Sequence, residues 1–314
     1  MKRLNILTWP IHGSYFNTLA RLDHNWYVPV KEDRSAEGYG GRGWTFDLPD
    51  YVREVPAEQV RDLDLDLLLF QTPRNYGEDQ YEILSEAQRR LPRIYLEHNT
   101  PRPHPTDTPH HVDDPSVLVV HVTRYNQLMW DTRVPSVVIE HSVAIDPGAQ
   151  YSGELERGIT VCNGMQKRPR ITGYDLLLQA RQHIPIDIAG MQTEAFGGLG
   201  DIPYRHLHRR VAQYRFLYSP MRYTSLPLAV IEALTIGMPV VALATTELPS
   251  ALQHGVHGFL SCDPEVLIEH MRTLLDDHDL ARRLGVNARE LARERFGLDR
   301  FIRDWNAAFA LARG

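Results

Sequence analysis

Short runs of apolar residues alternate along the chain with longer segments in which apolar residues recur every three to four positions. The runs LDLLLF at 65–70 and VLVVHV at 117–122 are nearly continuous, which is typical of strands buried on both faces of a parallel sheet. The longer segments indicate amphipathic helices that cover such sheets. The alternation predicts an α/β protein.

In the first half, the pattern predicts the strands Leu4–Thr8, Trp26–Val30, Leu65–Gln71, Arg93–His98, Val117–Val122 and Val137–Ile139. It predicts helices at Ser14–Leu22, Gly77–Arg90 and Arg124–Trp130. After a turn-rich stretch at 144–154 the pattern restarts, with strands Ile159–Cys162, Asp187–Ala189, Arg215–Tyr218, Pro239–Ala242 and Gly258–Ser261. The predicted helices there are Tyr174–His183, Tyr204–Tyr214, Leu228–Ile236, Pro249–His254 and Pro264–Asp276.

Two successive βα arrays of similar size predict two doubly wound, Rossmann-like domains that face a cleft, at 1–147 and 148–314. The tail is helical, and Gly297 divides it in two. Phe301, Trp305 and Phe309 recur every four residues and make one apolar face. Two packings stay open for that face: on the second domain, or back across on the first.

Composition and charge narrow the functional classes. The chain has 314 residues, of which 43% are hydrophobic and 24% charged, and its net charge is −6. That charge argues against a nucleic-acid partner, and no apolar run approaches the roughly 20 residues of a bilayer span. Cys162 and Cys262 lie far apart without metal spacing, so a reduced, cytoplasmic setting is the expectation.

The segment TSLPLAVIEALTIGMPVVA at 224–242 holds a lone carboxylate, Glu232, in an apolar helix. We expect this helix to begin near Ser225, with Thr224 or Ser225 as its N-cap, and its N-terminus to suit a phosphate. A buried carboxylate needs hydrogen bonds, and the two hydroxyls of a ribose would supply them. The alternative is a carboxylate paired with an arginine at the surface.

LPLAVIEALTIGMPVVA at 226–242 resembles the nucleotide-sugar signature of GT-B glycosyltransferases, specifically the retaining enzymes of family 4. The turn HGVHGFL at 254–260 resembles the family's next turn, with its two glycines. ERGITVCN followed by ITGYDLLLQA, and the tail at 280–301, match more loosely. The first half matches mainly in the order of its elements.

The resemblance implies a donor site in the second domain, with Glu232 on the ribose and Thr224, Ser225 and Leu226 near the donor. Arg222, just before Thr224, is a further candidate for binding phosphate at the start of the helix. Thr224 stands where the family has its first glutamate, next to the donor sugar. Lys167, Arg168 and Arg170, in the loop MQKRPR, are the expected contacts of the diphosphate, in place of a metal. A solvated loop of positive charge is the alternative for these three residues.

Two positions in the first domain complete the expected site. Gly13, in WPIHGSY, lets the backbone approach a ligand, and the resemblance places it opposite the donor phosphates. His98, at the end of a buried strand, is expected to hydrogen-bond a sugar or the donor; the alternative is a buried structural histidine. A metal site from His104, His110, His111 and Asp113 is a weaker alternative, because their spacing matches no known motif.

The sequence therefore predicts a retaining glycosyltransferase that moves a sugar from a nucleotide-diphosphate sugar to a saccharide, lipid-linked or small-molecule acceptor. It predicts no cofactor or metal, and a cytoplasmic location that includes the inner face of the membrane, where an acceptor could be lipid-linked. Two alternatives stay open: a nucleotide-sugar epimerase of the same fold, and a nucleotide-sugar-binding scaffold that lost activity with the first glutamate. An epimerase would change the sugar without an acceptor, and a scaffold would bind the donor without releasing free nucleotide diphosphate.

Overall fold

The computed structural model describes residues 2–43 and 45–314, and the chain divides into two units. Unit 1 contains Met1–Ala144 together with Leu298–Gly314, and unit 2 is Ile145–Gly297. The division after Ala144 lies three residues before the boundary expected at 147. The last helix belongs to unit 1, which is the second of the two packings that the sequence leaves open.

Unit 1 is built on a parallel sheet of seven strands in the order β3-β2-β1-β4-β5-β6-β7. The strands are β1 Asn5–Thr8, β2 Asn25–Val30, β3 Val52–Pro56, β4 Leu67–Phe70, β5 Arg93–Glu97, β6 Val117–His121 and β7 Ser136–Val138. β3, in YVREVP, was not predicted, because exposed Arg53 and half-buried Glu54 interrupt its apolar pattern at the sheet edge. β2 and β3 lie on one side of β1, and β4 to β7 lie on the other side, so the strand order reverses between β1 and β4.

The helices of unit 1 are α1 Gly13–Leu19, α2 Gln80–Ile83, α3 Arg124–Met129 and α11 Leu298–Arg313. Shorter helical turns lie at Ala57–Asp62, Asn75–Asp79 and Gln88–Arg90. The continuous helix predicted over Gly77–Arg90 is wrong. Leu84 is extended, and the Ser85 and Gln88 side chains hydrogen-bond each other's backbone N–H groups, so a new turn starts there.

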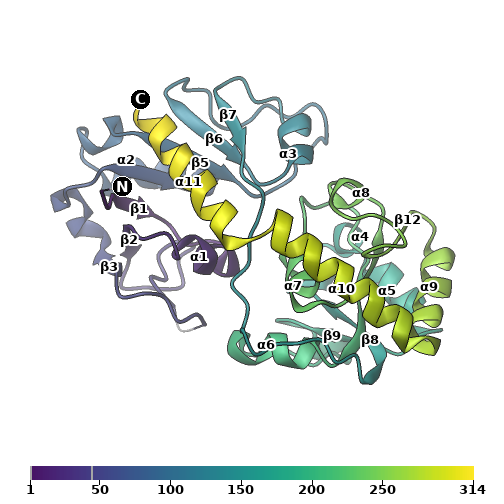
Figure 1. The fold of residues 1–314 in the computed structure, drawn as a ribbon. Helices are drawn as coiled ribbons and strands as arrows, with labels where there is room; N and C mark the ends of the chain where they lie inside the picture. Colours follow the sequence, from purple (N-terminus) through teal and green to yellow (C-terminus); the bar gives the residue numbers. More distant parts are fainter. Residues whose placement is uncertain (1, 44) are drawn as a thin grey trace. The chain divides into compact units, whose positions relative to one another are not determined.

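The apolar face of α11 is buried in unit 1, where the helix packs on β5 and β6 (Figure 1, yellow). Phe301, Trp305 and Phe309 are each fully buried, and the Trp305 indole donates to the Tyr15 hydroxyl at 3.3 Å. Phe309 also lies edge-on to Trp26 of β2. The four-residue spacing seen in the sequence is thus the face that closes the core of unit 1.

Unit 2 has a parallel sheet of five strands in the order β12-β11-β10-β8-β9. The strands are β8 Leu155–Val161, β9 Ile186–Ala189, β10 Tyr214–Ser219, β11 Val240–Leu243 and β12 Gly258–Ser261. Every strand predicted for the second half is present, with ends that differ by a few residues. β9 lies on one side of β8, and β10 to β12 lie on the other side, so the strand order reverses between β8 and β10.

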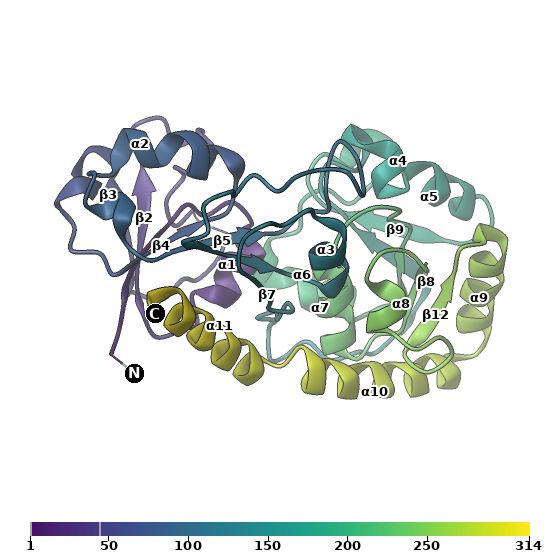
Figure 2. The same ribbon diagram turned by 90° about the horizontal axis from the view of Figure 1, so that it is seen from above.

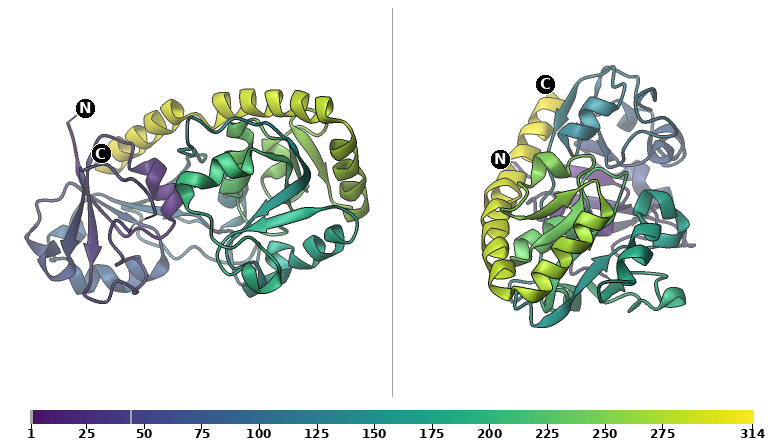
Figure 3. Two further views of the ribbon diagram at one scale, coloured as in Figure 1. Left: turned by 90° about the horizontal axis from the view of Figure 1, so that it is seen from below. Right: turned by 90° about the vertical axis from the view of Figure 1, so that its right-hand side faces the viewer.

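The helices of unit 2 are α4 Pro169–Thr172, α5 Tyr174–Arg181, α6 Tyr204–Val211, α7 Leu228–Ile236, α8 Leu248–Ala251, α9 Pro264–Asp276 and α10 His278–Arg295. α5 and α9 share an apolar core with Phe216 and Tyr218 of β10 on one side of the sheet (Figure 2). α7 packs on β10 and β11 and against α6 and α10. Figure 3 shows further views of the chain, with α10 in yellow-green and α11 in yellow. Within the described residues, none of the helices combines the length and the apolar character that a membrane crossing requires.

Candidate active site

The loops that leave β8 and β10 of unit 2 meet at the point where the sheet order reverses. Ligands of open α/β sheets bind at such a point, at the carboxyl ends of the strands. A small hollow here is lined by residues that include Thr160, Ser219, Met221 and Pro227. In the described part of the chain the buried Ser219 hydroxyl has no hydrogen-bond partner. The predicted donor residues lie on these two loops and on α7.

Glu232 lies one turn into α7 and is only 7% exposed. The Tyr204 hydroxyl donates to its Oε1 at 3.1 Å, and His208 Nε2 lies 3.7 Å from the same oxygen. Both side chains come from α6, where their four-residue spacing puts them on one face, with the rings edge-on at 4.7 Å. Tyr204 is the first residue of α6, so the carboxylate sits near the edge of the sheet where ligands bind.

His208 presents an N–H to Glu232. Its Nδ1 accepts a hydrogen bond from the Asp146 backbone N–H at 3.4 Å, so in the neutral ring the proton is on Nε2, the nitrogen that faces the carboxylate. Glu232 is therefore buried beside two donors from α6 rather than in an apolar environment. The sequence analysis missed Tyr204 and His208, although the pattern YRHLH carries their spacing.

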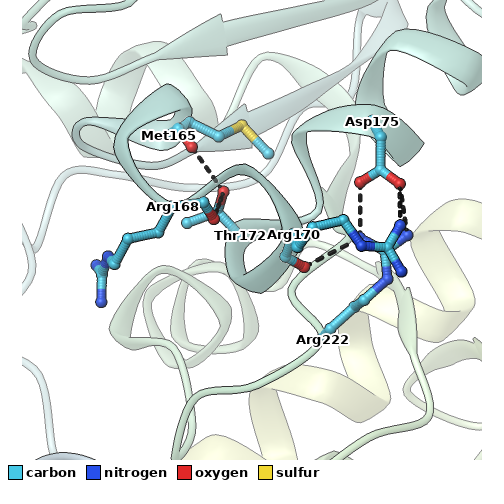
Figure 4. Close-up of polar contacts among 6 residues, drawn as sticks. All are labelled: Met165, Arg168, Arg170, Thr172, Asp175 and Arg222. Carbon is cyan, nitrogen blue, oxygen red and sulfur yellow. Dashed lines mark hydrogen bonds and ion pairs between the residues drawn. The ribbon is translucent and has the colours of Figure 1, made fainter. Parts of the chain in front are cut away.

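The basic loop of unit 2 is organised by a carboxylate that the sequence analysis also missed (Figure 4). Asp175, on α5, accepts hydrogen bonds from Arg222 Nη1 and Nη2 at 2.6 and 2.8 Å and from Arg170 Nη1 at 2.6 Å. These contacts, those of Arg222 first, hold the pKa of Asp175 below its ordinary value. Arg222 also donates to the Arg170 carbonyl at 3.0 Å. Two of the predicted phosphate ligands thus share one counter-ion.

Lys167 and Arg168 are placed differently. Both are exposed, and within residues 2–43 and 45–314 neither side chain has an ion pair. Thr172 shapes their loop, because its hydroxyl donates to the carbonyls of Met165 and Arg168 at 2.7 and 3.0 Å (Figure 4). Gly173 follows with φ +74°, and a Cβ there would lie 1.9 Å from the Pro220 carbonyl oxygen. The loop is closely packed on the end of β10, while the side chains of Lys167 and Arg168 face solvent.

The predicted N-cap of the Glu232 helix is wrong. α7 begins at Leu228 with Pro227 as its cap, and no side chain caps it. A residue before proline avoids helical backbone angles, so Leu226 cannot extend the helix toward Thr224 and Ser225. Ser225 and Leu226 are buried and Thr224 is half-buried in the loop between β10 and α7. All three lie beside the candidate donor site, but neither Thr224 nor Ser225 has the predicted capping role.

His98 of unit 1 directly follows β5, and its ring hydrogen-bonds Gln71, the residue that follows β4. The ring lies edge-on to His12 at 4.2 Å and to Tyr15 at 4.8 Å. Burial, with His12 and His141 as further causes, lowers the pKa of His98 well below its ordinary value. β1, β4 and β5 are neighbours where the order of the first sheet reverses, so His98 lies at the corresponding ligand-binding edge of unit 1.

Gly13 is the first residue of α1. A Cβ at this position would lie 2.5 Å from Cε2 of Phe46, so the glycine lets that ring pack against the start of the helix. A ligand-facing role for Gly13 stays a prediction.

The four residues weighed as a metal site do not come together as one. His110 Nδ1 accepts from the Val112 N–H at 3.1 Å, and its Nε2 lies 3.4 Å from buried Glu97. His104 is exposed. In the described part of the chain, no group of three or more His, Cys, Asp or Glu residues is arranged to hold a metal ion.

Comparison with protein families and curated proteins gives one match. Residues 164–277, which span the basic loop and α7, match the family described as glycosyl transferases group 1. No curated protein matches the chain. The family match supports a transferase and falls on the segment that holds Glu232.

Solved structures show the fold. Sucrose-phosphate synthase from Thermosynechococcus elongatus is similar with a TM-score of 0.71 at 13% identity, over 98% of this chain and 99% of that one. HepE from Anabaena, in complex with UDP-glucose, has a TM-score of 0.70 at 13% identity, over 98% and 100%. A mutant of S. aureus TarM, in complex with fondaparinux, alpha-GlcNAc-glycerol and UDP, has a TM-score of 0.62 at 14% identity, over 77% of this chain and 55% of that one. The chain has the GT-B fold predicted from its sequence.

Proposed function

Because this chain has the GT-B fold and its residues 164–277 match glycosyl transferases group 1, we propose that it is a glycosyltransferase that uses a UDP-sugar as donor. The observation that carries this proposal is the buried Glu232 carboxylate, which lies near the ligand-binding edge of unit 2, hydrogen-bonded to the Tyr204 hydroxyl and 3.7 Å from His208 Nε2. UDP is favoured as the nucleotide because the structures of HepE and TarM contain it.

In this proposal Glu232 accepts hydrogen bonds from the ribose hydroxyls, and the loops after β8 and β10 hold the diphosphate. Lys167 and Arg168 supply the positive charge that stabilises the departing diphosphate, because Arg170 and Arg222 share Asp175 as counter-ion. No metal ion is required for that role. Thr224, Ser225 and Leu226 line the donor side, and Thr224 offers the sugar a hydroxyl in place of a carboxylate.

The finer features of the reaction follow from the resemblance to family 4. We propose that the anomeric configuration is retained, with the leaving phosphate taking the acceptor proton, so that no protein base is needed. Unit 1 binds the acceptor, a saccharide or a lipid-linked saccharide, and His98 contacts a sugar hydroxyl. A role in polysaccharide or glycolipid synthesis on the cytoplasmic side of the membrane fits such an acceptor.

Product analysis with a panel of UDP-sugars tests the proposal. Incubation with a saccharide or lipid-linked acceptor should release UDP and increase the acceptor mass by one sugar. An altered sugar still attached to UDP, formed without acceptor, would instead identify the epimerase. A donor that raises the melting temperature but is not consumed with any acceptor would identify the scaffold. Neither alternative gains support from the comparisons above.

A further inference from the structure

Gln71 joins three neighbouring strands of unit 1 at their carboxyl ends. It follows β4 and is 2% exposed. Its Nε2 donates to the Thr8 hydroxyl at 3.0 Å and to the Trp9 carbonyl at 2.9 Å, at the end of β1. Its Oε1 lies 3.0 Å from His98 Nε2, at the end of β5. Both the NH₂ group and the carbonyl oxygen of this buried amide therefore have hydrogen-bond partners.

The partners determine which way the amide points. A backbone carbonyl can only accept a hydrogen bond, so the Gln71 atom beside the Trp9 oxygen must be the NH₂ group. The two N–H bonds of that group are used by Thr8 and Trp9. The remaining amide atom is the carbonyl oxygen, which can only accept. His98 must therefore donate from Nε2 to Gln71.

This contact selects one form of the His98 ring. A neutral imidazole carries one N–H and one lone pair. Burial and the neighbouring His12 and His141 rings favour the neutral ring. With the proton on Nε2, any hydrogen bond that His98 accepts must be accepted at Nδ1.

We propose that Gln71 is a positioning residue that holds His98 as the Nε2–H tautomer, so that His98 accepts a hydroxyl hydrogen bond of the reacting sugar at Nδ1. The proposal rests on the proposed function for the identity of the ligand, but not for the tautomer. Without Gln71 the Nε2 proton loses its acceptor, so the contact that favours the Nε2–H tautomer is lost. The proton could then move to Nδ1, where it would prevent that nitrogen from accepting a hydroxyl hydrogen bond.

A purely structural role makes a different prediction. Gln88 provides the matched control: it is also buried in unit 1, and its Nε2 also donates to two acceptors, here the backbone carbonyls of Val60 and Leu63, at 2.9 and 3.0 Å. Replacing either glutamine by methionine removes the two hydrogen bonds that Nε2 donates and also the acceptor Oε1, which in Gln88 serves Ser85. Only Gln71→Met also removes the acceptor of His98.

The direct test is a long-range ¹H–¹⁵N spectrum of protein labelled with ¹⁵N-histidine, with His98 assigned from the His98→Gln variant. We expect the Nε2–H pattern for His98 in the wild type and in Gln88→Met, and a changed or averaged pattern in Gln71→Met. An Nδ1–H or doubly protonated His98 in the wild type would overturn the proposal, and so would an unchanged pattern in Gln71→Met. If Gln71→Met does not fold, the wild-type spectrum still decides.

Kinetics with UDP-glucose, or whichever UDP-sugar is consumed, give the second readout. We expect Gln71→Met to lower kcat at least about tenfold, with a much smaller change in KM for the donor, and Gln88→Met to leave both near wild type. Equal kcat values for the two variants would overturn the functional part of the proposal. Because the spectrum needs no substrate, its outcome is separate from the success or failure of the proposed transferase activity.

Discussion

Arg222 and Asp175 form a bidentate ion pair, with Nη1–Oδ1 and Nη2–Oδ2 distances of 2.6 and 2.8 Å. The pair ties the loop after β10 to the first turn of α5, and Arg170 adds a further contact to the same carboxylate. An arginine that the sequence marks as a phosphate ligand thus has a structural partner. Its first role in the structure is to fasten the loop that leads to α7.

A double-mutant cycle with Arg222→Met and Asp175→Asn measures this role. The side chains are 25% and 42% exposed, so solvent screens the pair, and we expect a coupling energy of about 1 kcal/mol in the stability of unit 2. Urea unfolding followed by circular dichroism gives the four free energies. Additive effects of the two mutations would mean that the pair does not fasten the loop.

Lys167 and Arg168 should account for the affinity for the diphosphate. We expect Lys167→Met and Arg168→Met each to weaken UDP binding about tenfold, because each removes one charge-assisted hydrogen bond. Binding of uridine, which lacks phosphates, should not change. Calorimetric titrations with both ligands check this, and an equal loss for uridine would show that the mutations disturb the loop rather than the phosphate contacts.

The order of strands and helices could be predicted from the sequence because it depends on apolar periodicity, which is a local property. The runs that become β4 and β6 are buried on both faces as expected. The start of α7 was misplaced because capping residues were weighed more heavily than Pro227, whose effect on Leu226 is also local and could have been used.

Gly173 should be intolerant of a side chain, and Gly255 provides a control with the same backbone. Their φ angles are +74° and +76°, but a Cβ on Gly173 would lie 1.9 Å from the Pro220 oxygen, whereas one on Gly255 meets nothing within 4 Å. We expect Gly255→Ala to cost about 1 kcal/mol of stability from backbone strain alone. Gly173→Ala should cost clearly more in the same urea titration. Equal costs would show that the loop after β8 adjusts without difficulty.

Unit 1 should lose stability in acid because of its buried histidines. Burial lowers the pKa of His121 and of His141 from 6.5 to about 3. The unfolded chain therefore binds more protons than the folded unit between these values, and stability falls as the pH decreases from about 6.5 toward 3. The slope is about 1.4 kcal/mol per pH unit for each histidine.

Replacing His141 by phenylalanine tests this expectation. In the described part of the chain neither of its ring nitrogens has a hydrogen-bond partner, so His141→Phe should reduce the acid slope by one histidine with little loss at pH 7. Exposed His104→Gln is the control and should leave the slope unchanged. All five tryptophans fall in the residue ranges of unit 1, so their fluorescence reports its unfolding. An unchanged slope in His141→Phe would contradict the expectation.

Side-chain partners in the candidate site were largely beyond prediction from the sequence. Glu232 and His98 could be selected because each is a polar residue in an apolar element. Their partners could not, since Tyr204 is 28 residues before Glu232 and Gln71 is 27 before His98, and only the sheet topology brings them together. The pairing of Asp175 with Arg170 could have been predicted, because the two residues are close in the sequence. The pairing of Asp175 with Arg222 could not, because only the fold brings these two residues together.

Calorimetric binding of UDP and of 2′,3′-dideoxy-UDP to the wild type and to Glu232→Gln tests the central claim most directly. If Glu232 accepts hydrogen bonds from the ribose hydroxyls, the wild type should bind UDP at least about tenfold more tightly than the dideoxy ligand. Glu232→Gln should lose most of that difference while binding the dideoxy ligand as the wild type does. A preference for UDP that survives intact in Glu232→Gln would contradict the assignment of this carboxylate to the nucleotide.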